Sequence, residues 1–156
     1  MSRSFAATLA AILATALATA LATALAPVAA AQTMQAGAWD VTSTVVELTV
    51  PGMPGFLARM VRGKSKAEHK RIAAGQGVEA LLAPDPKAQC RIDSQTVADG
   101  RYAQALTCPQ KKGEPLRIVR AGTYDASSFA GRATVSGTTP KGQLNIVLEQ
   151  HAARVG

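Results

Sequence analysis

The fold of this 156-residue chain is decided by residues 89–108, QCRIDSQTVADGRYAQALTC. Two alternating stretches flank Ala98-Asp99-Gly100, which predicts a β-hairpin with a three-residue loop and Gly100 in the left-handed region. In the register that this loop implies, one largely apolar face carries Cys90, Ile92, Ser94, Thr96, Tyr102, Gln104, Leu106 and Cys108. The opposite face should meet water, because it carries Arg91, Asp93, Gln95, Arg101 and Thr107.

Further strands are predicted on both sides of this hairpin. Residues 116–124, 129–136 and 143–149 follow it, with a turn at residues 139–142 before the last strand. Residues 39–50 are rich in Thr and Val, and a change of apolar parity near Val45-Val46 predicts a bulge. The expected fold class is β-rich (α+β): an antiparallel meander of about five to six strands curling toward a small barrel or sandwich.

One or two short helices are expected between the first and second of these strands. Phe56, Leu57, Met60 and Val61 recur at the period of a helix, and Gly63 ends that helical turn. Ser65 and Glu68 match a capping box, which predicts a second helix running to about Ala74.

Residues 1–31 have the order of segments found in a secretory signal peptide. Arg3 precedes a long apolar run, and Pro27 precedes the small residues Ala29-Ala30-Ala31. Cleavage after Ala31 would leave residues 32–156 as a single periplasmic or secreted domain with no transmembrane segment. The minor alternative is an uncleaved membrane anchor, since the apolar run approaches the roughly 20 residues that span a bilayer.

The two cysteines are expected to form a structural disulfide. An exported protein enters an oxidising compartment, and the hairpin register places Cys90 opposite Cys108. The loop that this bond closes would contribute roughly 3 kcal/mol to stability. A redox-active role would favour Cys-x-x-Cys, which is absent.

The strongest candidate for a binding surface is a basic stretch over residues 56–71. The chain has a net charge of +7, and this stretch contains Arg59, Arg62, Lys64, Lys66, Lys70 and Arg71. Together with the apolar residues Phe56, Leu57, Met60 and Val61, these cations predict contact with an anionic membrane surface or an acidic partner. The alternative is that the apolar residues cover the open end of the sheet while the charges are solvated.

Motifs for catalysis, metal binding and nucleic-acid binding are not found. His69 and His151 are the only histidines, and nothing in the sequence places either beside a nucleophile or a set of zinc ligands. There is no glycine-rich phosphate loop, and the basic residues lack interleaved aromatic residues that would stack on bases. We therefore expect no catalytic residue, metal site, cofactor or nucleic-acid partner, and an enzyme is the least favoured interpretation.

Several short motifs together resemble the domain of unknown function 3617 family of exported proteobacterial proteins. They are residues 34–39 (MQAGAW), 51–54 (PGMP), 88–90 (AQC), 106–108 (LTC), 122–131 (GTYDASSFAG) and 153–156 (ARVG). The resemblance covers most of residues 32–156 and implies an exported, β-rich domain with no known activity.

Two functions fit these observations. The first is a non-enzymatic envelope module that binds a lipid or another envelope component; an apolar cavity open at one end of the sheet would favour it. The second is a structural or assembly protein that docks a protein partner through the edges of its sheet. A filled core with a flat exposed edge would favour that second function.

Overall fold

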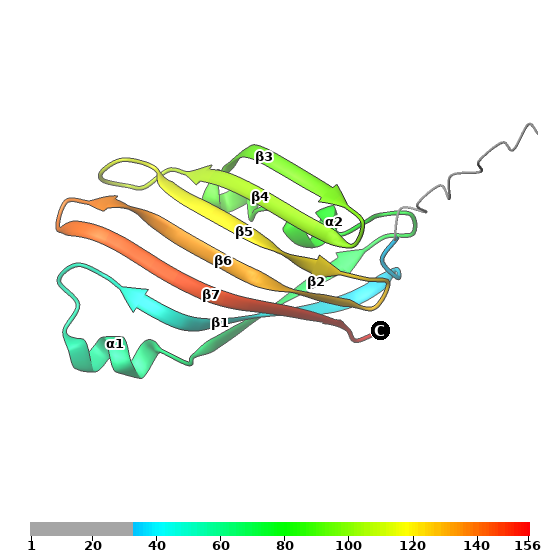
Figure 1. The fold of residues 1–156 in the computed structure, drawn as a ribbon, viewed down its shortest axis with the longest axis horizontal. Helices are drawn as coiled ribbons and strands as arrows, with labels where there is room; N and C mark the ends of the chain where they lie inside the picture. Colours follow the sequence, from blue (N-terminus) through cyan, green and yellow to red (C-terminus); the bar gives the residue numbers. More distant parts are fainter. Residues whose placement is uncertain (1–32) are drawn as a thin grey trace, which may run out of the picture.

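A computed structural model describes residues 33–156, so the predicted signal peptide and its cleavage site lie outside the described residues. Seven antiparallel strands form one sheet in the order β2-β1-β7-β6-β5-β4-β3 (Figure 1). They are β1 (Gly37–Thr49), β2 (Ser65–Ile72), β3 (Arg91–Ala98), β4 (Arg101–Cys108), β5 (Leu116–Tyr124), β6 (Ser128–Thr139) and β7 (Gly142–Arg154). The helices are α1 (Gly55–Val61), α2 (Glu79–Leu82) and the 3-10 turn Pro86–Ala88. The sheet is open, with β2 and β3 at its edges, and has one strand more than predicted.

The additional strand is β2, where the sequence analysis was wrong. Residues 65–72 were expected to begin a capped helix, but they pair with β1 from Thr44↔Ser65 to Gly37↔Ile72. The Ser65 hydroxyl lies 2.6 Å from the Thr44 hydroxyl on the neighbouring strand and does not cap a helix. The segment SKAEHKRI has no apolar period to hold a helix against the sheet, so the unpaired edge of β1 determines its conformation.

The β3–β4 hairpin forms, but its turn is shorter than predicted. Asp99 and Gly100 alone make the turn, with φ of 52° and 71°, as in the two-residue turns whose twist matches that of the strands. Ile92 still faces Leu106 as expected, because a bulge at Asp93 absorbs the one-residue shift. Beyond the bulge, the predicted faces of β3 are exchanged, and Gln95 rather than Ser94 faces Gln104.

The remaining strand predictions are confirmed. β1 has its bulge between Val45 and Glu47, so that Val46 is the extra residue. β5 has the predicted bounds, while β6 and β7 each extend beyond them and meet at the predicted turn, where Thr139 pairs with Gly142. On β4 the predicted inner face is buried, with Tyr102, Gln104, Leu106 and Cys108 all shielded from solvent.

The core is concentrated at the end of the sheet where β1 begins and β7 ends. It consists of Met34, Trp39, Val41, Ile72, Val78, Leu81, Leu82, Tyr102, Tyr124, Phe129 and Ala152. The rings of Tyr102 and Phe129 stack with centroids 4.8 Å apart. Gly131 makes room for them, since a Cβ there would lie 2.0 Å from the Tyr102 hydroxyl. α2 covers this end of the concave face, and the core does not extend over the rest of that face.

Candidate functional site

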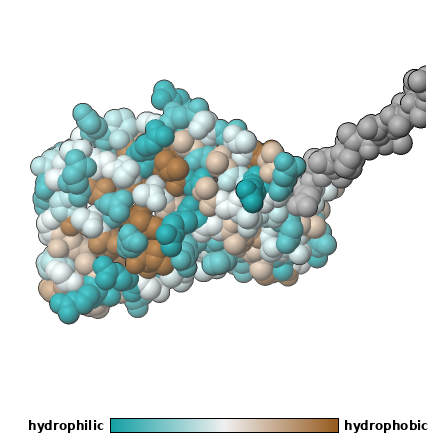
Figure 2. Space-filling model, viewed as in Figure 1, coloured by the Kyte–Doolittle hydropathy of each residue, from teal (hydrophilic) through white to brown (hydrophobic). Residues whose placement is uncertain are grey.

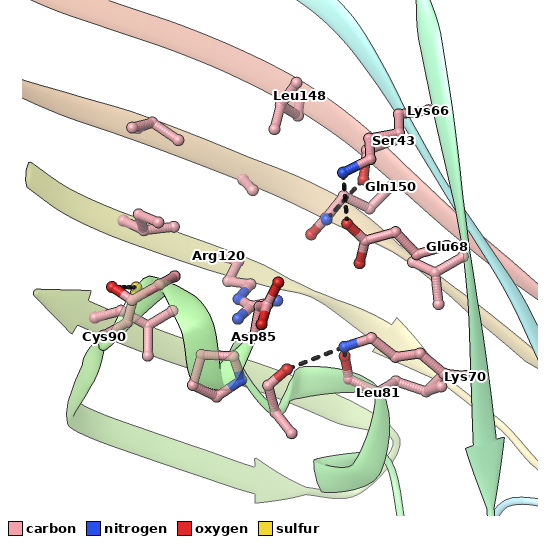
Figure 3. Close-up of a pocket in the computed structure, with 18 of the residues that line it drawn as sticks. Ser43, Lys66, Glu68, Lys70, Leu81, Asp85, Cys90, Arg120, Leu148 and Gln150 are labelled. Carbon is pink, nitrogen blue, oxygen red and sulfur yellow. Dashed lines mark hydrogen bonds and ion pairs between the residues drawn. The ribbon is translucent and has the colours of Figure 1, made fainter. Parts of the chain in front are cut away.

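A cavity of about 480 Å³ lies between the concave face of the sheet, β2 and the segment from Leu81 to Cys90 (Figure 3). Apolar side chains from five strands form its sheet wall: Val45, Leu106, Ile118, Ala133, Val135 and Leu148. The cavity forms because the core fills only one end of the curved sheet, and its volume falls in the range of small-molecule sites.

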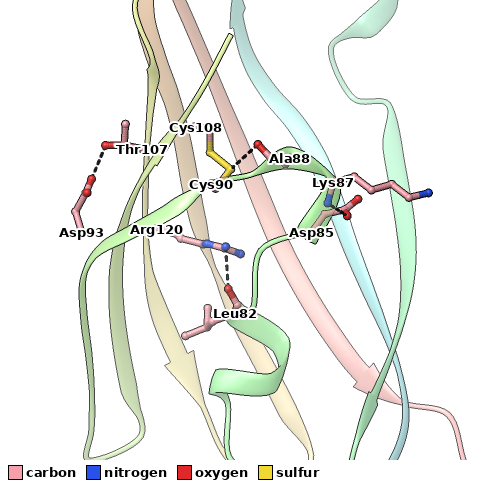
Figure 4. Close-up of a disulfide and its surroundings, with 9 residues drawn as sticks. All are labelled: Leu82, Asp85, Lys87, Ala88, Cys90, Asp93, Thr107, Cys108 and Arg120. Carbon is pink, nitrogen blue, oxygen red and sulfur yellow. Dashed lines mark hydrogen bonds between the residues drawn. A yellow bond between two sulfur atoms is a disulfide. The ribbon is translucent and has the colours of Figure 1, made fainter. Parts of the chain in front are cut away.

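Residues 81–90, which we call the cover segment, are fastened over this cavity at several points. Cys90 is bonded to Cys108 at the end of β4, as predicted, with Cα atoms 4.1 Å apart (Figure 4). The Lys70 ammonium donates to the carbonyl oxygens of Leu81, at 2.8 Å, and Ala83, at 3.0 Å. The Arg120 guanidinium donates to the carbonyl oxygen of Leu82 at 3.0 Å. The cover segment is therefore bound to β2, β4 and β5.

Arg120 is the most unusual side chain of the cavity. It comes from the middle of β5, where its neighbours on the same face are Ile118 and Gly122, and it points into the cavity (Figure 3). Its Nε atom is buried without a hydrogen-bond partner. Among residues 33–156, no carboxylate lies within 4.0 Å of its guanidinium. Burial lowers the pKa of Arg120, although Tyr102 and Glu68 act in the opposite direction. A partly desolvated cation thus faces the apolar wall of the cavity, and no carboxylate of residues 33–156 lies within ion-pair distance of it.

Other polar atoms near Arg120 also lack partners. The Gln150 amide donates to the Ser43 hydroxyl at 3.0 Å, but its carbonyl oxygen is buried and unpaired. The Tyr102 hydroxyl is likewise unpaired, and burial raises the pKa of Tyr102 to about 12. Native proteins rarely leave buried polar atoms unsatisfied, so these atoms indicate water or a ligand.

The edge of the cavity near β2 carries more positive than negative charge. Lys64, Lys66 and Lys70 line it together with Glu68 and Asp85. Lys66 and Glu68 form an ion pair at 3.3 Å. Burial lowers the pKa of Lys70, and the nearby Arg120 lowers it further. With Arg120, four cations and two carboxylates face the cavity.

The predicted basic stretch does not form one surface, because β2 is a strand. Lys64, Lys66 and Lys70 line the cavity, while Arg59 and Arg62 lie with α1 beyond the end of β1. Arg71 follows Lys70 in β2 and therefore points to the opposite face. Lys66 and Lys70, which the sequence predicts to contact an anionic surface, line the cavity.

The predicted apolar set lies on α1 without covering the sheet. No residue of α1 is buried, and Phe56, Leu57 and Met60 are 60%, 38% and 64% exposed. Val61 is partly shielded. Residues 55–61 form the predicted helix. The exposure of Phe56 and Met60 speaks against the alternative in which these side chains cover the open end of the sheet.

The remaining titratable groups form no compact set. His69 contacts the Asp40 carboxylate across β1 and β2, a pairing that the sequence analysis missed, and its side chain is 83% exposed. Within residues 33–156, no three His, Cys, Asp or Glu side chains are grouped to hold a metal ion. None of the helices in this range is long and apolar enough to cross a bilayer.

Arg120 and Gln150 are not among the predicted site residues, although the sequence contains a signal for each. On β5 the inner face reads Leu116, Ile118, Arg120, and on β7 it reads Leu144, Ile146, Leu148, Gln150. When one polar residue occupies a position in a row of apolar residues on the same face of a strand, its side chain is expected to point into the molecule.

The comparison with protein families matches residues 34–156 to the family described as protein of unknown function (DUF3617). The chain belongs to this family. The predicted resemblance is thereby confirmed over nearly all described residues of this DUF3617 protein. No curated protein and no solved structure matches it.

Proposed function

We propose that this DUF3617 protein binds a small amphipathic anion, such as a fatty acid, in the cavity beneath the cover segment. The observation that carries the proposal is Arg120, a half-buried arginine in an apolar wall whose buried Nε has no hydrogen-bond partner and which has no carboxylate within 4.0 Å among residues 33–156. An acyl chain would occupy the apolar wall, and its carboxylate would accept hydrogen bonds from Arg120.

The chemistry of the cavity favours binding over catalysis. Arginine remains protonated and is a poor general base, whereas its planar guanidinium suits recognition of a carboxylate. His69, which contacts Asp40, does not line the cavity. The sheet wall beside Arg120 is formed by apolar side chains such as Ile118 and Ala133, so a bound anion would meet a charged donor there.

Export to the periplasm or beyond the cell is part of this proposal. It rests on the signal-peptide pattern of residues 1–31 and on the Cys90–Cys108 disulfide, which is typical of oxidising compartments. The protein would then meet fatty acids and anionic lipids of the envelope as its binding partners.

Docking of a protein partner through the sheet edges is the alternative. Seven of the eight residues of β3 are exposed at its edge, which supports this function. However, β3 carries the bulge at Asp93 and the charged residues Arg91 and Asp93, features that discourage edge pairing. The cavity is therefore the better supported site.

Binding of cis-parinaric acid, a naturally fluorescent fatty acid, tests the proposal in the Arg120→Met variant. We expect its affinity to fall about tenfold to a hundredfold, because a hydrogen bond to a charged group contributes about 1.5–3 kcal/mol. A fatty alcohol of equal chain length, measured by displacement of a neutral apolar probe, should bind wild type and variant alike.

Arg132→Met is the matched control, since Arg132 is exposed on β6, pairs with Glu149 and does not line the cavity. It should bind cis-parinaric acid as wild type does. Near-ultraviolet circular dichroism of the buried Trp39 would verify that each variant is folded. The proposal is wrong if wild type binds neither compound, or if folded Arg120→Met retains full affinity for the acid.

A further inference from the structure

Three segments that are far apart in the sequence meet at the end of the sheet opposite the core. They are residues 50–64 with α1, the β4–β5 loop at residues 109–115, and the β6–β7 turn (Figure 1, left). Gln110 donates to the Thr138 carbonyl oxygen at 3.2 Å, which joins the loop to β6. A Cβ at Gly52 would lie 3.3 Å from Lys141, which places the turn beside the end of β1. We call these three segments together the basic end.

The basic end carries an excess of exposed cations. Its positive side chains are Arg59, Arg62, Lys64, Lys111, Lys112 and Lys141, and its sole carboxylate among these described segments is Glu114. None of the six forms an ion pair with a described carboxylate. Their charge is therefore available to an anionic partner.

Apolar side chains project from the same end. Phe56 and Met60 are 60% and 64% exposed on α1, and no part of residues 33–156 buries them. Figure 2 shows brown, apolar atoms interspersed with teal, charged ones on the visible face of the molecule. A seven-residue helix is too short to be stable alone, so α1 depends on the contacts that hold its ends.

The position of α1 is fixed by its connection to β1. The Gly63 amide donates to the Val45 carbonyl oxygen at 2.7 Å, and the Val45 amide donates to the Lys64 carbonyl oxygen at 3.0 Å. Gly63 has a φ of +84°, which favours glycine and allows the chain to turn from α1 into β2. The two exposed apolar residues are thus held in a defined orientation beside Arg59 and Arg62, which lie in the same segment.

We propose that the basic end docks on a membrane surface that contains anionic lipids. Phe56 and Met60 enter the headgroup region, and the surrounding cations contact lipid phosphates, a combination typical of interfacial helices. An apolar protein pocket would not need the cations. Phe56 is the one aromatic residue of these three segments, so successive nucleic-acid bases would find no series of rings to stack on. Lys64 lines the cavity and lies at the basic end, so docking would bring one edge of the cavity to the membrane. The inference does not require a ligand in the cavity.

Co-sedimentation of the purified exported protein with phospholipid vesicles tests this surface. At low salt, wild type should pellet with vesicles of phosphatidylglycerol and phosphatidylcholine but remain in solution with phosphatidylcholine alone. Arg59→Glu with Arg62→Glu should weaken binding tenfold or more, because each cation near an anionic surface contributes about 1 kcal/mol. Phe56→Ser with Met60→Ser should weaken it without changing the net charge.

The matched control is Arg71→Glu with Arg101→Glu, which makes the same change of net charge at the opposite end of the sheet. This control should retain most of its affinity. Equal losses in both charge-reversal variants, or no binding of wild type to anionic vesicles at low salt, would overturn the inference. If the vesicles do not bind, the result of the fatty-acid assay is still informative, because none of these variants changes Arg120 or the cavity wall.

Discussion

At the scale of single residues, the concave face contains polar atoms that no protein group satisfies. Arg120 Nε, Gln150 Oε1, Gln104 Oε1 and the Tyr102 hydroxyl are all buried without a partner. Each belongs to a strand whose inner face is otherwise largely apolar. Of these four residues, only Arg120 and Gln150 line the cavity, so the proposed ligand would contact them, whereas Tyr102 packs against Phe129.

The Tyr102→Phe variant tests this packing role. At pH 7 we expect the free energy of unfolding to stay within about 1 kcal/mol of wild type, because the hydroxyl has no hydrogen bond to lose. Burial raises the pKa of Tyr102 to about 12, so between about pH 10 and 12 the unfolded chain releases a proton that the folded chain retains. Wild type should therefore lose about 1–3 kcal/mol more than Tyr102→Phe over this range.

Urea unfolding at pH 8, 10 and 11.5 would measure that difference. Tyr124→Phe controls for loss of a phenol elsewhere in the same core. A large loss of stability for Tyr102→Phe at pH 8 would mean that the hydroxyl makes a stabilising contact, and would contradict the assignment.

At the scale of elements, the cover segment has little regular structure and depends on its attachments. It contains part of the four-residue α2 and one 3-10 turn, and it is held by the disulfide, Lys70 and Arg120. The disulfide also joins the start of β3 to the end of β4, at the edge of the sheet. Removing the disulfide should therefore lower the stability of the β3–β4 hairpin and loosen the attachment of the cover segment.

We expect Cys90→Ala with Cys108→Ala to lower the free energy of unfolding by roughly 3 kcal/mol, mainly because the unfolded chain gains freedom. Urea unfolding should show this loss, and wild type reduced with dithiothreitol should match the variant. Hydrogen exchange should also become faster in residues 81–90. An unchanged unfolding midpoint would show that the bond contributes nothing to the fold.

At the scale of the whole molecule, the two ends of the sheet have different compositions. One end holds the aromatic core, and the other holds the basic end with its uncovered α1. The cavity lies between them, lined by Phe129 from the core and by Lys64 from the basic end. In the proposed function, a ligand would move between a membrane at the basic end and Arg120 inside the cavity.

Export, which is part of the proposed function, is tested by the mature N-terminus. We expect the intact mass of protein recovered from the periplasm or the medium to correspond to residues 32–156, because Ala29-Ala30-Ala31 follows Pro27 as a cleavage site. Replacing Ala29 and Ala31 by Arg should block processing. An unprocessed wild-type chain retained in the membrane would instead support the anchor alternative.

Most strands, the disulfide and the family could be predicted from local features of the sequence. Alternation with period two, an Asp-Gly turn and facing cysteines are local signals, and local signals set the conformation of β1 and β4 to β7. The strand β2, the hairpin register and the cavity depend instead on contacts between distant segments. Residues 65–72 became a strand because β1 had an unpaired edge, and the register shifted because a bulge at Asp93 accommodates the shorter turn. The cavity depends on the curvature of the seven-stranded sheet and on the core filling only one end of it. Arg120 therefore becomes part of a site only when segments that are distant in the sequence enclose it.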